Sequence, residues 1–127
     1  MARLFIDTLM RYRQQRRFWV HDFVVMPDHF HLLLTPLDVT LERALQFIKG
    51  GFSYRVKKEL GLNTEVWARG YVDHRIRDAG DYARHVEYIR ANPIKACLAE
   101  NAKEYPYCSA YADYDVDPRP DELNVDE

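Results

Sequence analysis

The spacing of hydrophobic positions changes along the first third of the chain, from helical steps to a continuous apolar run. Apolar residues at steps of three and four predict a helix over residues 4–17. Aromatic and β-branched residues dominate residues 18–25, which predicts a strand. Pro27 then marks a tight turn, and residues 29–34 predict the returning strand. These features together predict an antiparallel hairpin.

The second half of the chain repeats this alternation. Thr40 is a predicted N-cap for a long amphipathic helix that ends at about Leu60. A third strand is predicted over residues 71–77, and a further helix over residues 81–92. Pro93 is expected to end that helix, because the residue before a proline disfavours helical geometry.

The element order is therefore helix, strand, strand, helix, strand, helix, which predicts an α+β fold. Helices are expected on one face of a small antiparallel sheet. The order resembles a ferredoxin-like βαββαβ unit that lacks its first strand. We expect one catalytic domain over residues 1–112 and a flexible acidic tail over residues 113–127.

Composition and charge narrow the class of protein. The chain has 127 residues, of which 47% are hydrophobic and 30% are charged, as in a soluble globular domain. The net charge of −2 conceals an asymmetry, because the last 15 residues hold seven acidic residues and one arginine. The first 112 residues carry a net charge of +4, which suits an anionic partner. The two cysteines and the lack of a signal-peptide pattern predict a cytoplasmic protein.

Two histidines separated by one residue are the sharpest local feature. His29 and His31 share one face of the second predicted strand, because alternate side chains of a strand point the same way. Their Cβ atoms should lie about 7 Å apart, which lets both imidazoles bind one ion. Two half-exposed histidines on a sheet surface are the simpler interpretation of the same pattern.

A second pair of polar residues lies on the last predicted helix. Tyr88 and Asn92 are four residues apart and so share one helix face, which differs from the predicted buried stripe. Tyrosines on amphipathic helices are more often packing residues with an exposed hydroxyl. Beside the histidines, however, the pair has a chemical use: two imidazoles and an amide oxygen form a neutral ligand set for a divalent metal, Mg²⁺ or Mn²⁺. The ion would activate a tyrosine nucleophile toward a phosphodiester.

Basic and aromatic residues predict a DNA-binding surface. Trp67 and Tyr71 can stack on unpaired bases, and Arg75 and Arg77 share one face of the third predicted strand. The long helix also carries basic residues, among them Arg55, for which a solvated face is the preferred interpretation.

With these residues assembled, the chain resembles the REP-associated tyrosine transposases, a branch of the single-tyrosine HUH transposases. The resemblance runs from about residue 18 to residue 110. It is carried by FVVMPDHFHLL at 23–33, by VW at 66–67 with YVD at 71–73 and IR at 76–77, by YIRANPIKA at 88–96 and by YPYCSA at 105–110.

The resemblance implies a ferredoxin-like fold and metal-dependent cleavage of single-stranded or hairpin DNA. His29, His31 and Asn92 match the metal ligands of the family. Tyr88 matches the nucleophile, which forms a 5′-phosphotyrosine and releases a 3′-hydroxyl. The family usually begins with a strand before the first helix, and the absence of that strand here leaves catalytic competence open.

Two other functions therefore remain open. One alternative is a non-catalytic DNA-binding protein, a truncated or domesticated transposase, which would bind hairpin DNA without a metal. A zinc hydrolase is the other alternative, because His21 lies on the neighbouring predicted strand and can join His29 and His31. Monomer and homodimer are both compatible with the sequence.

Overall fold

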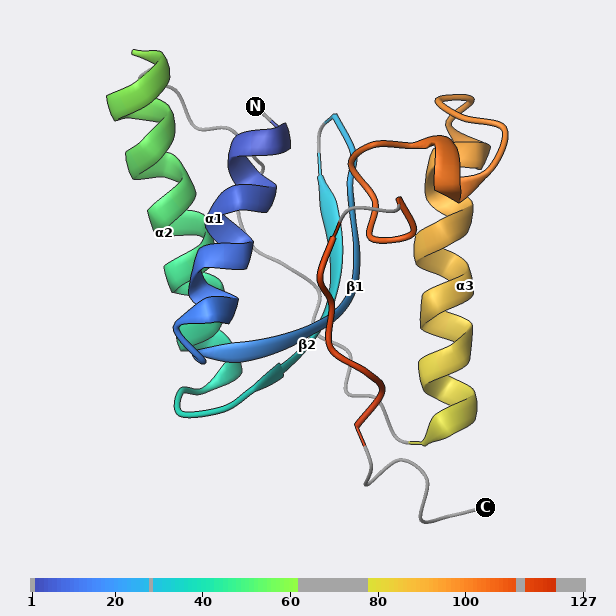
Figure 1. Cartoon of the computed structure of the whole chain (residues 1–127), viewed down its shortest axis with the longest axis horizontal. Coiled ribbons are helices and arrows are strands. Elements are labelled where there is room, and N and C mark those ends of the chain that lie inside the picture. Colours follow the sequence, from blue (N-terminus) through green and yellow to red (C-terminus); the bar gives the residue numbers. More distant parts are fainter. Residues whose placement is uncertain (1, 28, 62–77, 112–113, 121–127) are drawn as a thin grey trace.

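The computed structural model describes residues 2–27, 29–61, 78–111 and 114–120, and its chain trace is drawn in Figure 1. The helices and strands of this part follow in the order α1 (Ala2–Gln14), β1 (Phe18–Val25), β2 (Phe30–Pro36), α2 (Leu41–Leu60), α3 (Ala79–Lys95) and the short 3-10 helix η1 (Ala102–Glu104). The α+β class predicted from the sequence is confirmed. The third predicted strand, at 71–77, lies outside the described residues.

The strands β1 and β2 form the predicted antiparallel hairpin. Phe23 pairs with Leu32 and Val24 pairs with His31, and a bulge interrupts the register between Val20 and Asp22. One extra residue at a bulge shifts the alternation of side chains between the two faces. The bulge therefore changes which residues of β1 point toward each face of the hairpin.

The helices cover both faces of the hairpin, which corrects the expectation that all lie on one face. Figure 1 shows α1 and α2 together on one side of the two strands and α3 on the opposite side. The physical reason is that β1 is apolar on both faces. Phe23 belongs to the cluster beneath α1 and α2, and Val24 belongs to the cluster beneath α3. Each face needs a helix to remove its apolar surface from water.

The larger core lies between the hairpin and the helices α1 and α2. Its aromatic centre is a T-shaped pair, Phe5 of α1 and Phe52 of α2, with ring centroids 5.4 Å apart. The fully buried members of this core also include Phe18, Phe23, Leu9, Ile48, Val20 and Val56. Such burial is the main source of stability in a domain of this size.

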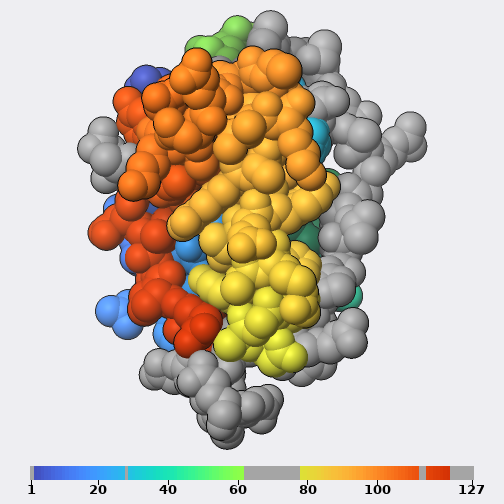
Figure 2. All heavy atoms as spheres, turned by 90° about the vertical axis from the view of Figure 1, so that its right-hand side faces the viewer, coloured from blue at the N-terminus to red at the C-terminus, as the bar shows by residue number. Residues whose placement is uncertain are grey.

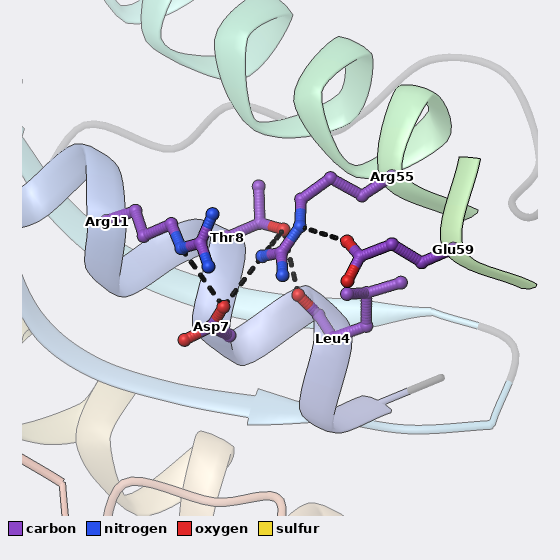
Figure 3. A network of polar contacts seen from close by, with 6 residues as sticks. All are labelled: Leu4, Asp7, Thr8, Arg11, Arg55 and Glu59. Carbon is purple, nitrogen blue, oxygen red and sulfur yellow. Dashed lines mark hydrogen bonds and ion pairs between the residues drawn. The ribbon is translucent and has the colours of Figure 1, made fainter. Parts of the chain in front are cut away.

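Arg55 ties α1 to α2 above this core (Figure 3). Its guanidinium contacts Asp7 of α1 and Glu59 of α2, at 2.7 Å in each case. It also donates a hydrogen bond to the hydroxyl of Thr8, and Arg11 approaches Asp7 from the other side. Arg55 therefore joins two helices. This corrects the sequence-based interpretation, which placed it on a solvated face.

The two longer helices, α2 and α3, both begin with a side-chain cap. Thr40 caps α2 by accepting a hydrogen bond from the backbone N–H of Arg43, and Gly61 follows the helix with a φ of 68°. Both predicted boundaries of this helix are confirmed. α3 begins two residues before the predicted start at residue 81. Its N-cap is Asp78, whose carboxylate accepts a hydrogen bond from the N–H of Asp81.

Pro93 lies inside α3 and does not end it, which corrects the prediction that the helix stops at Asn92. The helix continues to Lys95, and the N–H of Ala96 still bonds to the carbonyl of Asn92. The φ of proline is itself helical, so the last turn forms at the loss of one backbone hydrogen bond. The buried ring of Pro93 adds apolar contact in return.

The C-terminal segment, residues 107–111 and 114–120, packs along the outer edge of β1. Cys108 forms an isolated antiparallel bridge with Val24, and the N–H of Asp117 donates to the carbonyl of Val20. The carboxylate of Asp117 also binds Arg13 through two hydrogen bonds of 2.9 Å. Residues 114–120 of the expected acidic tail thus cover a strand edge that would otherwise expose unpaired backbone groups.

Within the described ranges, none of the helices has the length and hydrophobicity needed to cross a bilayer.

Candidate active site

The two predicted histidines lie at the start of β2, on the face covered by α3. His29 comes immediately before the strand and His31 is its second residue, so Phe30 between them points into the opposite core. The imidazole centroids are 5.0 Å apart and the rings are almost perpendicular. The N–H of Met26 donates to the carbonyl of His29, which closes the hairpin turn. The hydrogen-bonded turn therefore fixes the backbone position of His29.

Tyr88 of α3 reaches the same place from the helix above the strands. Its ring centroid lies 5.1 Å from that of His31, again in an edge-to-face arrangement. The side chain remains 53% exposed, so the phenol is accessible to a substrate and is not a core residue. The structure thus brings together two histidines and a tyrosine that are far apart in the sequence.

Asn92 lies one turn beyond Tyr88 on α3. Its side-chain nitrogen Nδ2 donates to the backbone carbonyl of Tyr88 at 2.8 Å. This bond engages the nitrogen with the helix backbone, so the carbonyl oxygen Oδ1 is the group of this side chain that can act as a ligand. Lys95 continues the same helix side, with its Nζ 5.8 Å from the centroid of the Tyr88 ring.

The surroundings of His31 favour its neutral form. Partial burial lowers the pKa of His31, and the neighbouring His29 lowers it further. An imidazole must be unprotonated to bind a metal, so this direction favours metal binding at neutral pH. In the described part of the chain, no three His, Cys, Asp or Glu side chains are grouped so that they could hold a metal ion. Within the described residues, a ligand set built on these two histidines would therefore draw on Asn92, water or substrate.

The position of α3 over the strands is set by a second, smaller core. Ile89, which follows Tyr88, is 3% exposed and packs with Val24, Met26 and Leu33. Because Ile89 points down, Tyr88 and Asn92 are placed on the open flank of the helix. Figure 2 shows α3 crossing this face of the molecule, with the C-terminal segment beside it.

A buried carboxylate that the sequence analysis missed lies under the same helix. Asp22 is 2% exposed, accepts a hydrogen bond from Ser109, and has Arg90 of α3 at 4.0 Å. Its second oxygen, Oδ2, is buried and has no hydrogen-bond partner among the described residues. Burial raises the pKa of Asp22, while Ser109 and the charge of Arg90 act against this shift. The burial of Asp22 results from tertiary contacts, and no local sequence pattern predicts it.

His21 does not join the other two histidines. It is 7% exposed, and one of its ring nitrogens lies 2.8 Å from the hydroxyl of Thr35. The other ring nitrogen lies 3.2 Å from the carbonyl of Asp117. Both nitrogens are therefore engaged at the bulge in β1, which removes the three-histidine site on which the zinc hydrolase reading depended.

The predicted DNA-binding residues cannot be placed against this site. Trp67, Tyr71, Arg75 and Arg77 lie outside the described residues. Of the predicted site residues, the structure thus brings together His29, His31 and Tyr88, with Asn92 one helical turn away.

Comparison with protein families gives the class to which this arrangement belongs. A family model described as "Transposase IS200 like" matches residues 2–92, which include the hairpin, both histidines, Tyr88 and Asn92. The chain therefore belongs to the IS200-like transposase family.

Within that family, the chain is similar to REP-associated tyrosine transposases, which confirms the resemblance found in the sequence. It is 31% identical to a putative REP-associated tyrosine transposase of Haemophilus influenzae, over 77% of this chain and 62% of the relative. It is 27% identical to the REP-associated tyrosine transposase of Escherichia coli, over 83% of this chain and 62% of the relative. The chain thus spans less than two thirds of the length of these curated relatives.

The fold is also similar to that of a solved structure. It is that of a REP-associated tyrosine transposase bound to a REP hairpin, and it matches with a TM-score of 0.69. The match covers 93% of this chain and 73% of the other, at 26% sequence identity.

Proposed function

We propose that this protein cleaves and transfers single-stranded DNA at a hairpin, with Tyr88 as the nucleophile. The observation that carries the proposal is the edge-to-face contact between Tyr88 and His31, at 5.1 Å, beside His29. Membership of the IS200-like transposase family supports DNA as the substrate class. The solved relative bound to a REP hairpin supports a hairpin as the form of DNA that is recognised.

The residues present fit a divalent metal. His29 and His31 would hold the ion through imidazole nitrogens, and Asn92 would hold it through the oxygen Oδ1. Such a mixed set suits Mn²⁺ or Mg²⁺, and it leaves coordination positions for water and for phosphate oxygen. When bound, the ion would neutralise negative charge that develops on the phosphate during cleavage.

The chemical step of the proposal is a displacement at phosphorus. The phenolic oxygen of Tyr88 forms a bond to phosphorus and loses its proton to solvent. The bond from phosphorus to the 3′ oxygen breaks, and that oxygen takes up a proton to become a 3′-hydroxyl. The product is a 5′-phosphotyrosine, which a second 3′-hydroxyl can attack to complete strand transfer. The exposed position of Tyr88 is compatible with access by a DNA strand.

The decisive experiment follows the covalent product. The full chain is incubated with a labelled single-stranded hairpin oligonucleotide and Mn²⁺, and protein–DNA adducts are separated under denaturing conditions. We expect an adduct with the wild type and its complete loss with Tyr88→Phe, because phenylalanine keeps the ring and lacks the attacking oxygen. A chelator should also abolish the adduct.

The matched control is Tyr54→Phe. Tyr54 is 63% exposed on α2, on the other side of the hairpin, and its substitution should leave the adduct unchanged. An undiminished adduct with Tyr88→Phe would exclude Tyr88 as the nucleophile. Hairpin binding that needs no metal and gives no adduct would instead support a non-catalytic DNA-binding protein.

A further inference from the structure

Lys95 shares the side of α3 that carries Tyr88 and Asn92. The three residues follow each other at intervals of four and three, which places them on one stripe of the helix. The Nζ atom of Lys95 lies 5.8 Å from the centroid of the Tyr88 ring, and the residue is exposed. A flexible cation therefore lies beside the proposed nucleophile, on the surface that a DNA strand has to reach.

The end of a helix offers a simpler explanation for a lysine. A positive charge in the last turn interacts favourably with the helix dipole. That effect explains a basic residue near the C-terminus of α3, but it is indifferent to the side of the helix on which the residue lies. Contact with an aromatic ring near 6 Å is also weak at an exposed site. Neither effect explains why the cation shares the stripe of Tyr88.

The charge balance of the site gives Lys95 a use. Imidazole and amide groups bind a metal as uncharged ligands, so His29, His31 and Asn92 would contribute no charge of their own toward a phosphodiester. A lysine side chain ends in a compact ammonium with three hydrogen-bond donors on a flexible stem. A phosphate in position for attack has its phosphorus about 3–3.5 Å from the phenolic oxygen. Its non-bridging oxygens would then lie within reach of the ammonium.

We propose that Lys95 binds the phosphate group that Tyr88 attacks. This inference rests on the proposed function, because it names a further residue of the same site. Lys95 takes no part in bond making or breaking; it holds a non-bridging oxygen and thereby positions phosphorus against Tyr88. The ligand is the backbone phosphate of single-stranded DNA, whatever its sequence.

The first test measures binding without cleavage. In a Tyr88→Phe background, the affinity for the hairpin oligonucleotide is measured at several salt concentrations, with and without Lys95→Gln. We expect about tenfold weaker binding and a salt dependence that is smaller by roughly 0.7 in log–log slope, the value for one contact to a single strand. Lys95→Arg should restore both quantities in large part.

Lys58→Gln is the matched control. Lys58 lies 5.6 Å from the ring of Tyr54 on α2, so it reproduces an exposed lysine over a tyrosine away from the site. Its substitution should change neither the affinity nor the slope. Equal losses for Lys95→Gln and Lys58→Gln would overturn the proposal, because they would report net charge alone.

The second test measures the rate of adduct formation with Tyr88 intact. We expect Lys95→Gln to lower this rate at least tenfold and Lys58→Gln to leave it unchanged. A Lys95→Gln protein with the wild-type rate and the wild-type salt slope overturns the role of Lys95 while leaving Tyr88 as nucleophile. Absence of any adduct with the wild type contradicts the proposed function, and the binding experiment still decides whether Lys95 contacts phosphate.

Discussion

The two faces of the β1–β2 hairpin differ in chemistry, although alternate residues of the same two strands form them. The face under α1 and α2 is lined by large apolar side chains such as Phe23, and its helices are joined by the Arg55 network (Figure 3). The face under α3 carries a buried carboxylate, Asp22, and the imidazole of His31.

One face of this small sheet therefore provides most of the stability, and the other face carries the candidate active site. The apolar face removes a continuous hydrophobic surface from water, which is where most of the folding free energy arises. The face under α3, the polar face, also contains polar groups that are costly to bury, such as a carboxylate oxygen of Asp22 that has no hydrogen-bond partner among the described residues. A site of that kind is tolerated because the opposite face supplies the stability. Substitutions on the two faces should therefore have different consequences.

The largest effect is expected for His31→Ala. Loss of one of two imidazoles should lower adduct formation by at least about a thousandfold, which corresponds to about 4 kcal/mol in activation free energy. The free energy of unfolding should change by less than about 1 kcal/mol, because the residue is only partly buried. Adduct formation is followed on denaturing gels and stability by urea unfolding.

The matched control for this prediction is His85→Ala, which removes a half-buried histidine of α3 that lies one turn before Tyr88 and bonds to the carbonyl of Asp81. It should retain adduct formation. Retention of the adduct by His31→Ala would show that the polar face is not the reactive one.

The second effect is expected for Phe52→Ala on the apolar face. Phe52 is 1% exposed and packs edge-to-face against Phe5, so truncation leaves a cavity that costs about 3–5 kcal/mol of unfolding free energy. A loss of this size can unfold a small domain, so Phe52→Leu provides a milder variant with a cost of about 1 kcal/mol.

Denaturant unfolding gives the stability of both Phe52 variants. Phe52→Leu should form adduct at the wild-type rate once the folded fraction is taken into account. A lower rate per folded molecule would contradict the separation of the two faces.

The smallest effect is expected for Asp22→Asn, and it depends on pH. Burial raises the pKa of Asp22 in the folded state, so its contribution to stability is fully present below the unfolded pKa of about 4. That contribution is lost as the pH rises through the folded pKa. The neutral variant should therefore be more stable than the wild type at pH 7, by about 1 kcal/mol, the usual size of a single-substitution effect.

Thermal or urea unfolding between pH 3.5 and pH 8 measures this difference. The advantage of Asp22→Asn should shrink toward the acid end of the range. Parallel stability curves for the two proteins would indicate that the Asp22 carboxyl is not disfavoured by its burial.

Much of the molecule follows from local patterns. The hairpin, the α2 boundaries at Thr40 and Gly61, and the shared helix face of Tyr88 and Asn92 were all predictable. Each depends on residues that are close in sequence, where backbone geometry dictates which side chains point together. Lys95 belongs to the same stripe and the same spacing could have singled it out.

Other features depend on contacts between distant segments. The continuation of α3 through Pro93 follows from packing of the last turn, which outweighs the local preference of proline. The docking of Asp117 on Val20 and Arg13 turns part of an acidic segment into the cover of a strand edge. Composition alone favours a solvated tail there, because it carries no information about partners about a hundred residues away.

The sequence by itself determined the secondary structure of most of the described chain, the alternation that aligns His29 with His31, and the family to which the chain belongs. Only the tertiary structure decided that α3 covers the face opposite α1 and α2, and hence that Tyr88 meets His31. The reason is physical: periodicity states which side chains share a face of one element, whereas the choice of face for each helix depends on the apolar surface that both sides of the sheet must bury.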